Sequence, residues 1–293
     1  MNILNSYKAS VTFLVQFSNT LLSLIKIIIS TDFKVNKLPS ANSVSCILLG
    51  NGPSLTTSLT KYENTLHNYS LICVNNFAST PQFEQLKPSY YVMLDPSYWA
   101  VNPTKEVANC FKDLSNKTSW EVHLLVPAQA KKSAHFINII SSNKNISVHY
   151  FNYVVFKGFD SMAHFLFKRN LATPQCQNIL VACLFLGINI GFKNIYLLGA
   201  DHTWHQNLHI NQNNDLCLKD VHFYDDVEHT NYRLFYKDAS HTSTFKMHEI
   251  LATLSKAFYG YETIKHYADS RDTTIYNASE ISFIDAFTHT EIK

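Results

Sequence analysis

Six short apolar runs, separated by longer helical or irregular segments, constrain the fold of this chain more than any other feature of its sequence. Several of the runs are apolar at nearly every position, which is typical of strands buried on both faces of a parallel sheet. They occupy residues 44–49, 71–74, 90–94, 122–126, 148–151 and 195–198. We therefore predict an α/β fold, with a Rossmann-like, mostly parallel twisted sheet and flanking helices.

Three further segments complete the expected architecture. Residues 178–192 predict a buried helix that closes near Gly191 and leads into the last strand. Residues 201–240 are polar, lack Gly and Pro, and show weak periodicity, which favours a lid or acceptor-binding insertion over more sheet. Residues 241–259 return to a helical pattern. We expect residues 1–43 to form an N-terminal helix and connector, and residues 44–293 to form the Rossmann-like domain.

The composition excludes several classes of protein. The hydrophobic fraction is 46% and the charged fraction 16%, as in ordinary globular proteins. A net charge of +2 with scattered Lys and Arg argues against a nucleic-acid partner. The six cysteines form no CxxC pair and several lie in apolar runs, which favours buried free thiols in a reducing compartment. No cleavage pattern follows the N-terminal apolar stretch, so we expect a cytoplasmic protein.

The stretch from residue 11 to residue 30 predicts an amphipathic helix. Its apolar residues recur at spacings of three and four on one stripe, while polar residues occupy the rest. The stripe consists of Leu14, Phe17, Leu21, Ile25 and Ile28. Two interpretations remain open: attachment to the inner face of the cell membrane, or packing against the body of the protein or a second subunit in a homo-oligomer.

Polar residues follow three successive strands, where an open α/β sheet places its ligand crevice. Gly50, Asn51 and Gly52 follow the first strand, where a tight turn lets backbone amides approach a phosphate or ribose. Asn75 follows the second strand and Asp95 the third. Amide side chains donate and accept hydrogen bonds, which suits ribose hydroxyls and base edges. The alternative for each residue is a local cap or turn.

A second cluster follows the strand at residues 195–198 and invites a metal interpretation. Asp201, His202, His205 and His209 lie within nine residues, and histidines three and four apart can share a helix face. The segment shows no helical pattern and no Glu accompanies the histidines as a general base. We therefore expect no metal, and favour recognition of an acceptor or phosphate.

The strand-end motifs together resemble the bacterial lipooligosaccharide sialyltransferase family. The resemblance rests on Gly50-Asn51-Gly52-Pro53-Ser54-Leu55, the turns at Asn75 and Asp95, and the run Gly191-Phe192-Lys193-Asn194-Ile195-Tyr196-Leu197-Leu198-Gly199-Ala200-Asp201. It covers about residues 44–260. The same motifs also resemble relatives found with surface-polysaccharide genes, some described as pterin diphosphokinase-like or as motility accessory factors.

The resemblance implies a donor site for a cytidine monophosphate (CMP) sugar, with no further cofactor and no metal. Asn51 and Asn75 would contact the nucleotide, and Asp95 stands where the family commonly has Asn. Asn178, or alternatively Thr173, would take the place of a Ser-Gly pair before the buried helix. The remaining nucleotide-site residues expected from these motifs are Gly50, Gly52, Ser54 and Asp201.

The resemblance also assigns the chemistry. The family's catalytic base is a His at the start of the helix after the lid, which corresponds to His241; the alternative is that Ser240 caps that helix and His241 is merely exposed. Tyr232, Tyr224, Tyr236 or His202 would stabilise the departing phosphate. The expected reaction is inverting transfer of a sialic or related ulosonic acid to a glycan acceptor of lipopolysaccharide, O-antigen or capsule. The alternatives are a pterin diphosphokinase-like enzyme and a non-catalytic assembly protein.

Overall fold

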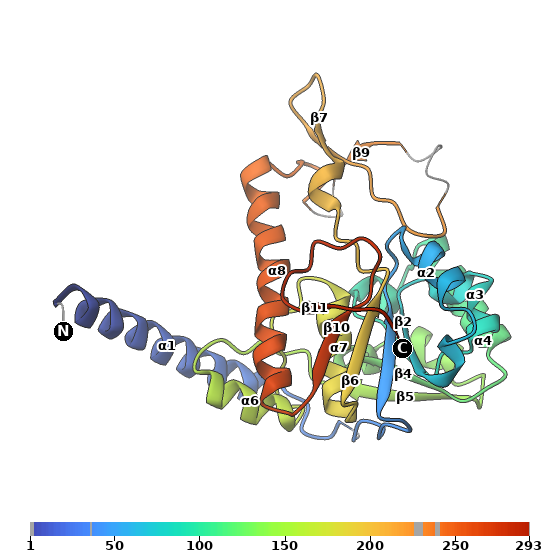
Figure 1. Ribbon diagram of the computed structural model, residues 1–293, viewed down its shortest axis with the longest axis horizontal. Coiled ribbons are helices and arrows are strands. Elements are labelled where there is room, and N and C mark those ends of the chain that lie inside the picture. The colour runs from blue at the N-terminus through green and yellow to red at the C-terminus, as the bar shows by residue number, and fades with distance from the viewer. Residues whose placement is uncertain (1–2, 36, 226–230, 238–240, 293) are drawn as a thin grey trace.

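A computed structural model describes residues 3–35, 37–225, 231–237 and 241–292 of the chain. Its centre is an eight-stranded sheet in the order β11-β10-β6-β1-β2-β3-β4-β5, and every pairing between neighbouring strands is parallel (Figure 1). The predicted α/β fold with a parallel sheet and flanking helices is confirmed.

The six predicted strands are all present, with ends shifted by up to two residues. The strands of the large sheet are β1 (Ser45–Leu49), β2 (Ser70–Val74), β3 (Tyr90–Val92), β4 (Val122–Pro127), β5 (Ile146–Phe151), β6 (Asn194–Leu198), β10 (Thr274–Asn277) and β11 (Thr288–His289). The last two were not predicted, because they are only four and two residues long and contain no apolar run.

Helices cover both faces of this sheet, and one hydrophobic cluster fills the space between the sheet and the helices on each face. Along β1, Cys46 and Leu48 pack into one cluster while Ile47 and Leu49 pack into the other, as the two-residue period of a strand requires. The first cluster includes α6 (Asp160–Lys168), α7 (Ile179–Ile190) and α8 (Met247–Asp269). The second includes α2 (Leu55–Lys61), α3 (Gln82–Leu86), α4 (Lys105–Lys117) and α5 (Ala134–Ile140).

Helix α7 matches its prediction closely. Asn178 caps its N-terminus by accepting hydrogen bonds from the amides of Leu180 and Val181, and Gly191 ends it with a left-handed φ of 112°. Nearly every residue of α7 is buried, which explains why the helix is apolar on all sides.

The predicted start of the helix after the insertion was wrong. Helix α8 begins at Met247 rather than at residue 241, and it continues to Asp269. The backbone amide of Lys246 donates to the Glu249 carboxylate and so caps the helix, while Thr244 forms an isolated bridge with Tyr236. Residues 241–246 therefore belong to the preceding segment, and Ser240 lies outside the described residues.

The segment between β6 and α8, residues 201–246 and hereafter the insertion, stands over one end of the sheet (Figure 1). It carries a small antiparallel sheet of its own, made of β7 (Leu208–Ile210), β8 (Leu216–Leu218) and β9 (Arg233–Leu234). The weak periodicity of this segment did not predict these strands, which are separate from the large sheet. The segment is tied to the loop after β1, because the amide of Phe223 donates to the Asn51 carbonyl over 3.0 Å.

Helix α1 (Ile3–Ser30) projects away from the body of the protein (Figure 1). The predicted helix is present, but its apolar stripe does not pack on the body of the protein. All five residues of the apolar stripe are exposed, whereas Thr20 and Ser23 are buried. All six cysteines are buried free thiols, as expected.

Candidate functional site

The loop after β1 is built by close approach to the loop after β6. A Cβ atom on Gly50 would lie 2.3 Å from the Gly199 carbonyl oxygen, and one on Gly52 would lie 2.4 Å from Asp201 Oδ1. The amides of Gly50 and Gly52 donate to the carbonyls of Leu198 and Gly199. These glycines are therefore required for packing. Because both amides are already engaged, they are not free to bind a phosphate or ribose, and a contact of this turn with a nucleotide stays a prediction.

The side chain of Asn51 is the strongest sign of a ligand in the described structure. Asn51 is only 9% exposed, yet neither its Nδ2 nor its Oδ1 has a hydrogen-bond partner among the described residues. It lines a cavity at the carboxyl ends of β1, β2 and β6. Burying an unpaired amide costs about 1–3 kcal/mol, so a bound molecule is expected to supply its partners.

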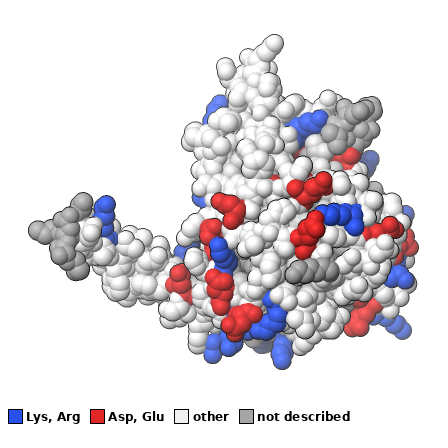
Figure 2. Space-filling view, viewed as in Figure 1, with Lys and Arg blue, Asp and Glu red and all other residues white. Residues whose placement is uncertain are grey.

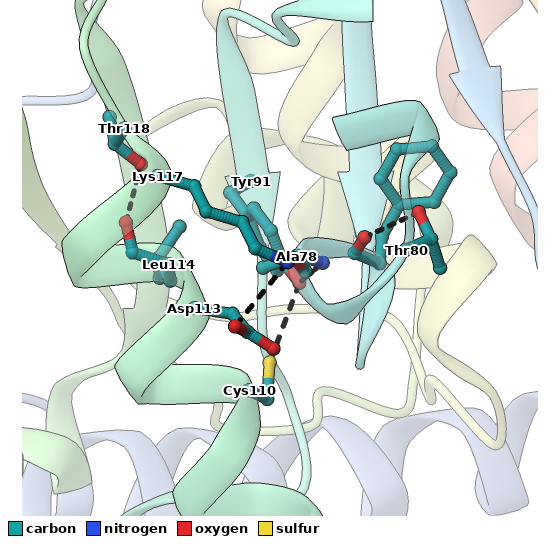
Figure 3. A network of polar contacts seen from close by, with 9 residues as sticks. Ala78, Thr80, Tyr91, Cys110, Asp113, Leu114, Lys117 and Thr118 are labelled. Carbon is teal, nitrogen blue, oxygen red and sulfur yellow. Dashed lines mark hydrogen bonds and ion pairs between the residues drawn. The ribbon is translucent and has the colours of Figure 1, made fainter. Parts of the chain in front are cut away.

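Asn75 lines the same cavity from the end of β2. It adopts a left-handed φ of 53°, which Asn tolerates better than most residues. The hydroxyl of Tyr91 donates to the Asn75 carbonyl over 2.5 Å and accepts from the Ala78 amide over 2.9 Å. Figure 3 shows Tyr91 and Ala78 next to Cys110 of α4, whose thiol also donates to the Asn75 carbonyl. These hydrogen bonds from Tyr91 and Cys110 therefore fix the backbone of the turn.

Lys117 extends this support to the other end of the loop. Its ammonium group donates to the Ala78 carbonyl over 3.2 Å and pairs with Asp113 over 3.3 Å, as Figure 3 shows. Helix α4 is thus fixed to the short helical turn η2 (Phe77–Ser79) that follows Asn75. This arrangement leaves the Asn75 side chain at the cavity while its backbone is immobilised.

Asp201 and Ser54, both predicted site residues, bind each other. The Ser54 amide and hydroxyl donate to the two carboxylate oxygens of Asp201 over 2.9 and 2.5 Å. Burial raises the pKa of Asp201 above its usual value, although the hydrogen bonds from Ser54 oppose this. Asp201 lines the cavity, but its carboxylate primarily joins the loops after β1 and β6.

Asn178, Tyr261 and His202 form a buried chain behind the cavity. The Tyr261 hydroxyl donates to Asn178 Oδ1 over 3.1 Å and lies 2.5 Å from His202 Nε2. Because the hydroxyl has only one proton to give, this network assigns the N–H of His202 to Nε2. Burial lowers the pKa of His202 to about 3, so the imidazole is neutral. The Asn178 Nδ2 group has no partner among the described residues.

In this geometry the N–H of His202 is engaged with Tyr261 and is not free to bind a ligand. The other ring nitrogen of His202 can accept but cannot donate to a phosphate. The ring stacks on Trp204 with centroids 4.2 Å apart, and both residues line the cavity. The predicted direct contact of His202 with a departing phosphate stays a prediction that this network does not favour.

A second and larger cavity adjoins the first. The first measures about 120 Å³ and the second about 760 Å³, and they share Asn178, Trp204 and Asp220. Sites for small molecules usually measure about 300–1,000 Å³, so a nucleotide cannot fit in the first cavity alone. The second lies between the insertion and α8. Its apolar wall is formed by Leu208, Leu218, Leu234, Phe235, Ile250, Leu254 and Ala257.

His241 lines the second cavity, but not at the start of a helix. It lies six residues before α8, has a left-handed φ of 55°, and stacks on Tyr236 with ring centroids 4.4 Å apart. Its side chain is exposed. The expected position of this His at the start of a helix was therefore wrong, while its position beside a cavity leaves a catalytic role as a prediction.

Several other predicted residues lie outside both cavities. Asp95 is exposed and accepts from the Ser97 amide over 2.8 Å, which caps the turn η3 (Pro96–Trp99). Its expected contact with a nucleotide is not supported, and the local cap explains it. Tyr232 is 49% exposed and packs on His209. Thr173, the alternative to Asn178, is buried and pairs with Val155.

The histidines after β6 do not assemble into a metal site. Among the residues the structure describes, no group of three or more His, Cys, Asp or Glu side chains could hold an ion. His205 packs edge-on against Phe283, and His209 lies in β7 at the exposed end of the insertion. These two residues therefore point to different surroundings from Asp201 and His202.

The insertion supplies two residues that sequence reasoning missed. His222 lines the first cavity, and its Nδ1 lies 3.0 Å from a carboxylate oxygen of Asp225, which also accepts from the His222 amide. Such a carboxylate orients an imidazole and fixes its tautomer. Arg233 lines the second cavity, 3.6 Å from Asp220. A His three residues before an Asp was visible in the sequence, but nothing there placed it at the cavity.

Comparison with known proteins gives the family. A family model described as 6-hydroxymethylpterin diphosphokinase MptE-like matches residues 19–207. This chain belongs to that family. The family match contains Asn51, Asn75, Asn178 and His202, and ends before the part of the insertion that carries His222 and Arg233. The expected relationship to pterin diphosphokinase-like proteins is confirmed, whereas sialyltransferase specificity stays a prediction.

A solved structure is also similar, at a greater distance. It is the MAf glycosyltransferase from Magnetospirillum magneticum AMB-1, with 11% sequence identity and a TM-score of 0.49. The match covers 94% of this chain but only 38% of the solved chain. A search of curated proteins gives no match.

Proposed function

We propose that this chain is a nucleotide-dependent transferase, with the nucleotide spanning the first cavity and the adjoining part of the second, and the reacting groups where the two cavities meet. The buried, unpaired amide of Asn51 carries this proposal. With Asn75 and the free Nδ2 of Asn178, it forms a set of groups that donate and accept, as base edges and ribose hydroxyls require. The set lies at the carboxyl ends of parallel strands, where α/β proteins bind ligands.

More specifically, we propose a glycosyltransferase that uses a CMP-activated sugar. Among the described residues, no Lys or Arg lines the first cavity and Arg233 alone lines the second. This low density of positive charge suits a donor with one phosphate better than a triphosphate. The resemblance to sialyltransferases extends the proposal to a sialic or related ulosonic acid as the sugar and a bacterial surface glycan as the acceptor.

The cavities provide places for both halves of an inverting displacement. An acceptor hydroxyl oxygen attacks the anomeric carbon as the bond from that carbon to the phosphate oxygen breaks. We propose that His222, oriented by Asp225, takes the hydroxyl proton. The electron pair of the broken bond stays with CMP, whose phosphate would lie near Arg233. His241, in the second cavity, is the alternative base.

A pterin diphosphokinase-like reaction is the second candidate, and the family match favours it. Asn side chains suit the polar edge of a pterin as well as that of a nucleobase. This reaction would require adenosine triphosphate (ATP) and magnesium, and several positive charges around the phosphates. The scarcity of Lys and Arg in both cavities makes it the less favoured candidate.

Thermal unfolding with nucleotides tests the proposal without an acceptor. A ligand that binds only the folded state raises Tm, by about 2.7 kcal/mol of stabilisation at one hundred times Kd. We expect CMP to raise Tm without magnesium, and more than the uridine, guanosine or adenosine nucleotides do. A rise only with ATP and magnesium would favour the diphosphokinase candidate, and no rise with any nucleotide would contradict both.

A further inference from the structure

Helix α1 presents an extensive apolar surface to the outside of the protein. Nine large apolar side chains on its outer side are between 42% and 77% exposed. They are Val11, Leu14, Val15, Phe17, Leu21, Leu22, Ile25, Ile28 and Ile29. Residues 5–30 are long and apolar enough to cross a membrane, as judged by length and composition. Exposed apolar patches of this size mark sites of interaction with another molecule or a membrane.

The opposite side of α1 docks on the body through the buried Ile27 and through hydrogen bonds of its polar residues. The Ser23 hydroxyl donates to the Lys157 carbonyl over 2.8 Å and accepts from its amide over 2.9 Å. Thr20 Oγ1 accepts from the Phe159 amide over 3.1 Å. Gly158 allows this contact, since a Cβ there would lie 2.1 Å from Thr20 Oγ1. These bonds fix which side of the helix faces outward.

The same bonds argue against a helix that crosses a bilayer. The ring of Phe13 packs on that of Phe159 with centroids 5.5 Å apart, so only the part of α1 before Phe13 is free of the body, and residues 5–12 span about 12 Å at 1.5 Å per residue. The hydrocarbon core of a bilayer is about 30 Å thick. Exposed apolar residues continue past this point, at Leu21, Ile25 and Ile28, along the docked part of the helix. A surface parallel to α1 would cover all of them at once.

The width of the apolar surface favours lipid over a second protein helix. At about 100° per residue, the nine side chains extend over an arc of about 160° around the helix. The seam of a two-stranded coiled coil is a narrower stripe, set by two positions in each heptad. A partner helix would leave much of this arc in water, whereas the hydrocarbon boundary of a bilayer would cover it.

The charge on α1 favours an anionic surface. Residues 1–31 contain no Asp or Glu, and their only charged side chains are Lys8 and Lys26. Figure 2 shows the projecting helix largely without charge, with Lys or Arg near its tip. Each Lys near an anionic bilayer contributes about 1 kcal/mol of attraction. We propose that α1 lies in the plane of an anionic membrane surface, with its apolar arc inserted and its polar side holding the body.

Flotation of the full chain with vesicles tests this proposal. We expect binding to phosphatidylcholine vesicles that contain 30% phosphatidylglycerol, and weaker binding to pure phosphatidylcholine. The double substitution Phe17→Glu and Leu21→Glu, at two exposed positions, should weaken binding at least tenfold. Val101→Glu, at an 87% exposed apolar residue elsewhere on the surface, is the matched control and should bind like the wild type.

Two results would overturn the proposal. One is the absence of binding to both kinds of vesicle, or binding that the double substitution leaves unchanged. The other is self-association, seen by light scattering and abolished by the double substitution, because a second copy would then cover the arc. Tm of both variants should equal that of the wild type. The response of Tm to CMP should also be unchanged, which separates this test from that of the proposed transferase.

Discussion

At the scale of single residues, the first cavity brings together three asparagine side chains and an imidazole that a carboxylate orients, those of Asn51, Asn75, Asn178 and His222. Asn51, Asn75 and Asn178 were predictable because each follows a buried strand or begins a buried helix, and strand order brings those positions together. Asp95 satisfied the same rule but caps its own turn. His222 could not be predicted, since its position depends on how an insertion without regular periodicity folds back over β1.

The two candidate bases can be separated by substitution. We expect His222→Asn to reduce turnover by a factor on the order of 100 to 10,000 while CMP affinity changes little, because the loss falls on proton transfer. His241→Asn is the matched variant in the second cavity and should retain most of the activity. Steady-state transfer assays with each variant measure this. The reverse pattern would return the role to His241 and contradict the assignment of His222.

At the scale of elements, the apolar runs predicted six strands. The exact ends of strands and helices depend on contacts with other parts of the chain. The helix expected from residue 241 begins at Met247 because Thr244 pairs with Tyr236 in the insertion. The apolar stripe of α1 was recognised as one helix face, but the sequence could not show that the polar side docks. Hydrogen bonds from Ser23 to a loop 134 residues away leave no local pattern.

The network of His202, Tyr261 and Asn178 joins the end of β6 to α7 and α8, and it predicts a dependence of stability on pH. The pKa of His202 is about 3 in the folded state, against an ordinary value of 6.5. Between about pH 6.5 and pH 3, His202 therefore binds a proton in the unfolded chain but not in the folded chain. The resulting stability is complete above pH 6.5 and is lost as pH falls toward 3, by up to about 1.4 kcal/mol per pH unit.

Urea unfolding between pH 7.5 and 5.0 measures this effect. We expect the free energy of unfolding of His202→Gln to fall less steeply with decreasing pH than that of the wild type, since Gln does not titrate. His135→Gln, at an exposed position, is the control and should keep the wild-type slope. Equal slopes for His202→Gln and the wild type would show that His202 is not held neutral by burial.

At the scale of the whole molecule, the ends of the parallel strands supply the amide side chains of Asn51 and Asn75 to the first cavity. The insertion supplies His222 to the same cavity. The loops after β1 and β6 are locked together through Gly52, Ser54 and Asp201, so the Asn51 amide is held in place before a ligand arrives. Helix α1, the proposed membrane-binding element, lies on a different part of the molecule from the insertion (Figure 1). Binding of a donor and attachment to a surface can therefore be studied separately.

Calorimetric titration of CMP into the wild type and Asn51→Ala tests the central claim most directly. The account predicts that Asn51→Ala weakens CMP binding at least tenfold, while the free energy of unfolding without ligand stays the same or rises, because a buried unpaired amide is removed. Asn178→Ala is the contrasting variant and should lose stability, since Asn178 caps α7. Unchanged CMP affinity in Asn51→Ala, or no CMP binding by the wild type, would contradict the account.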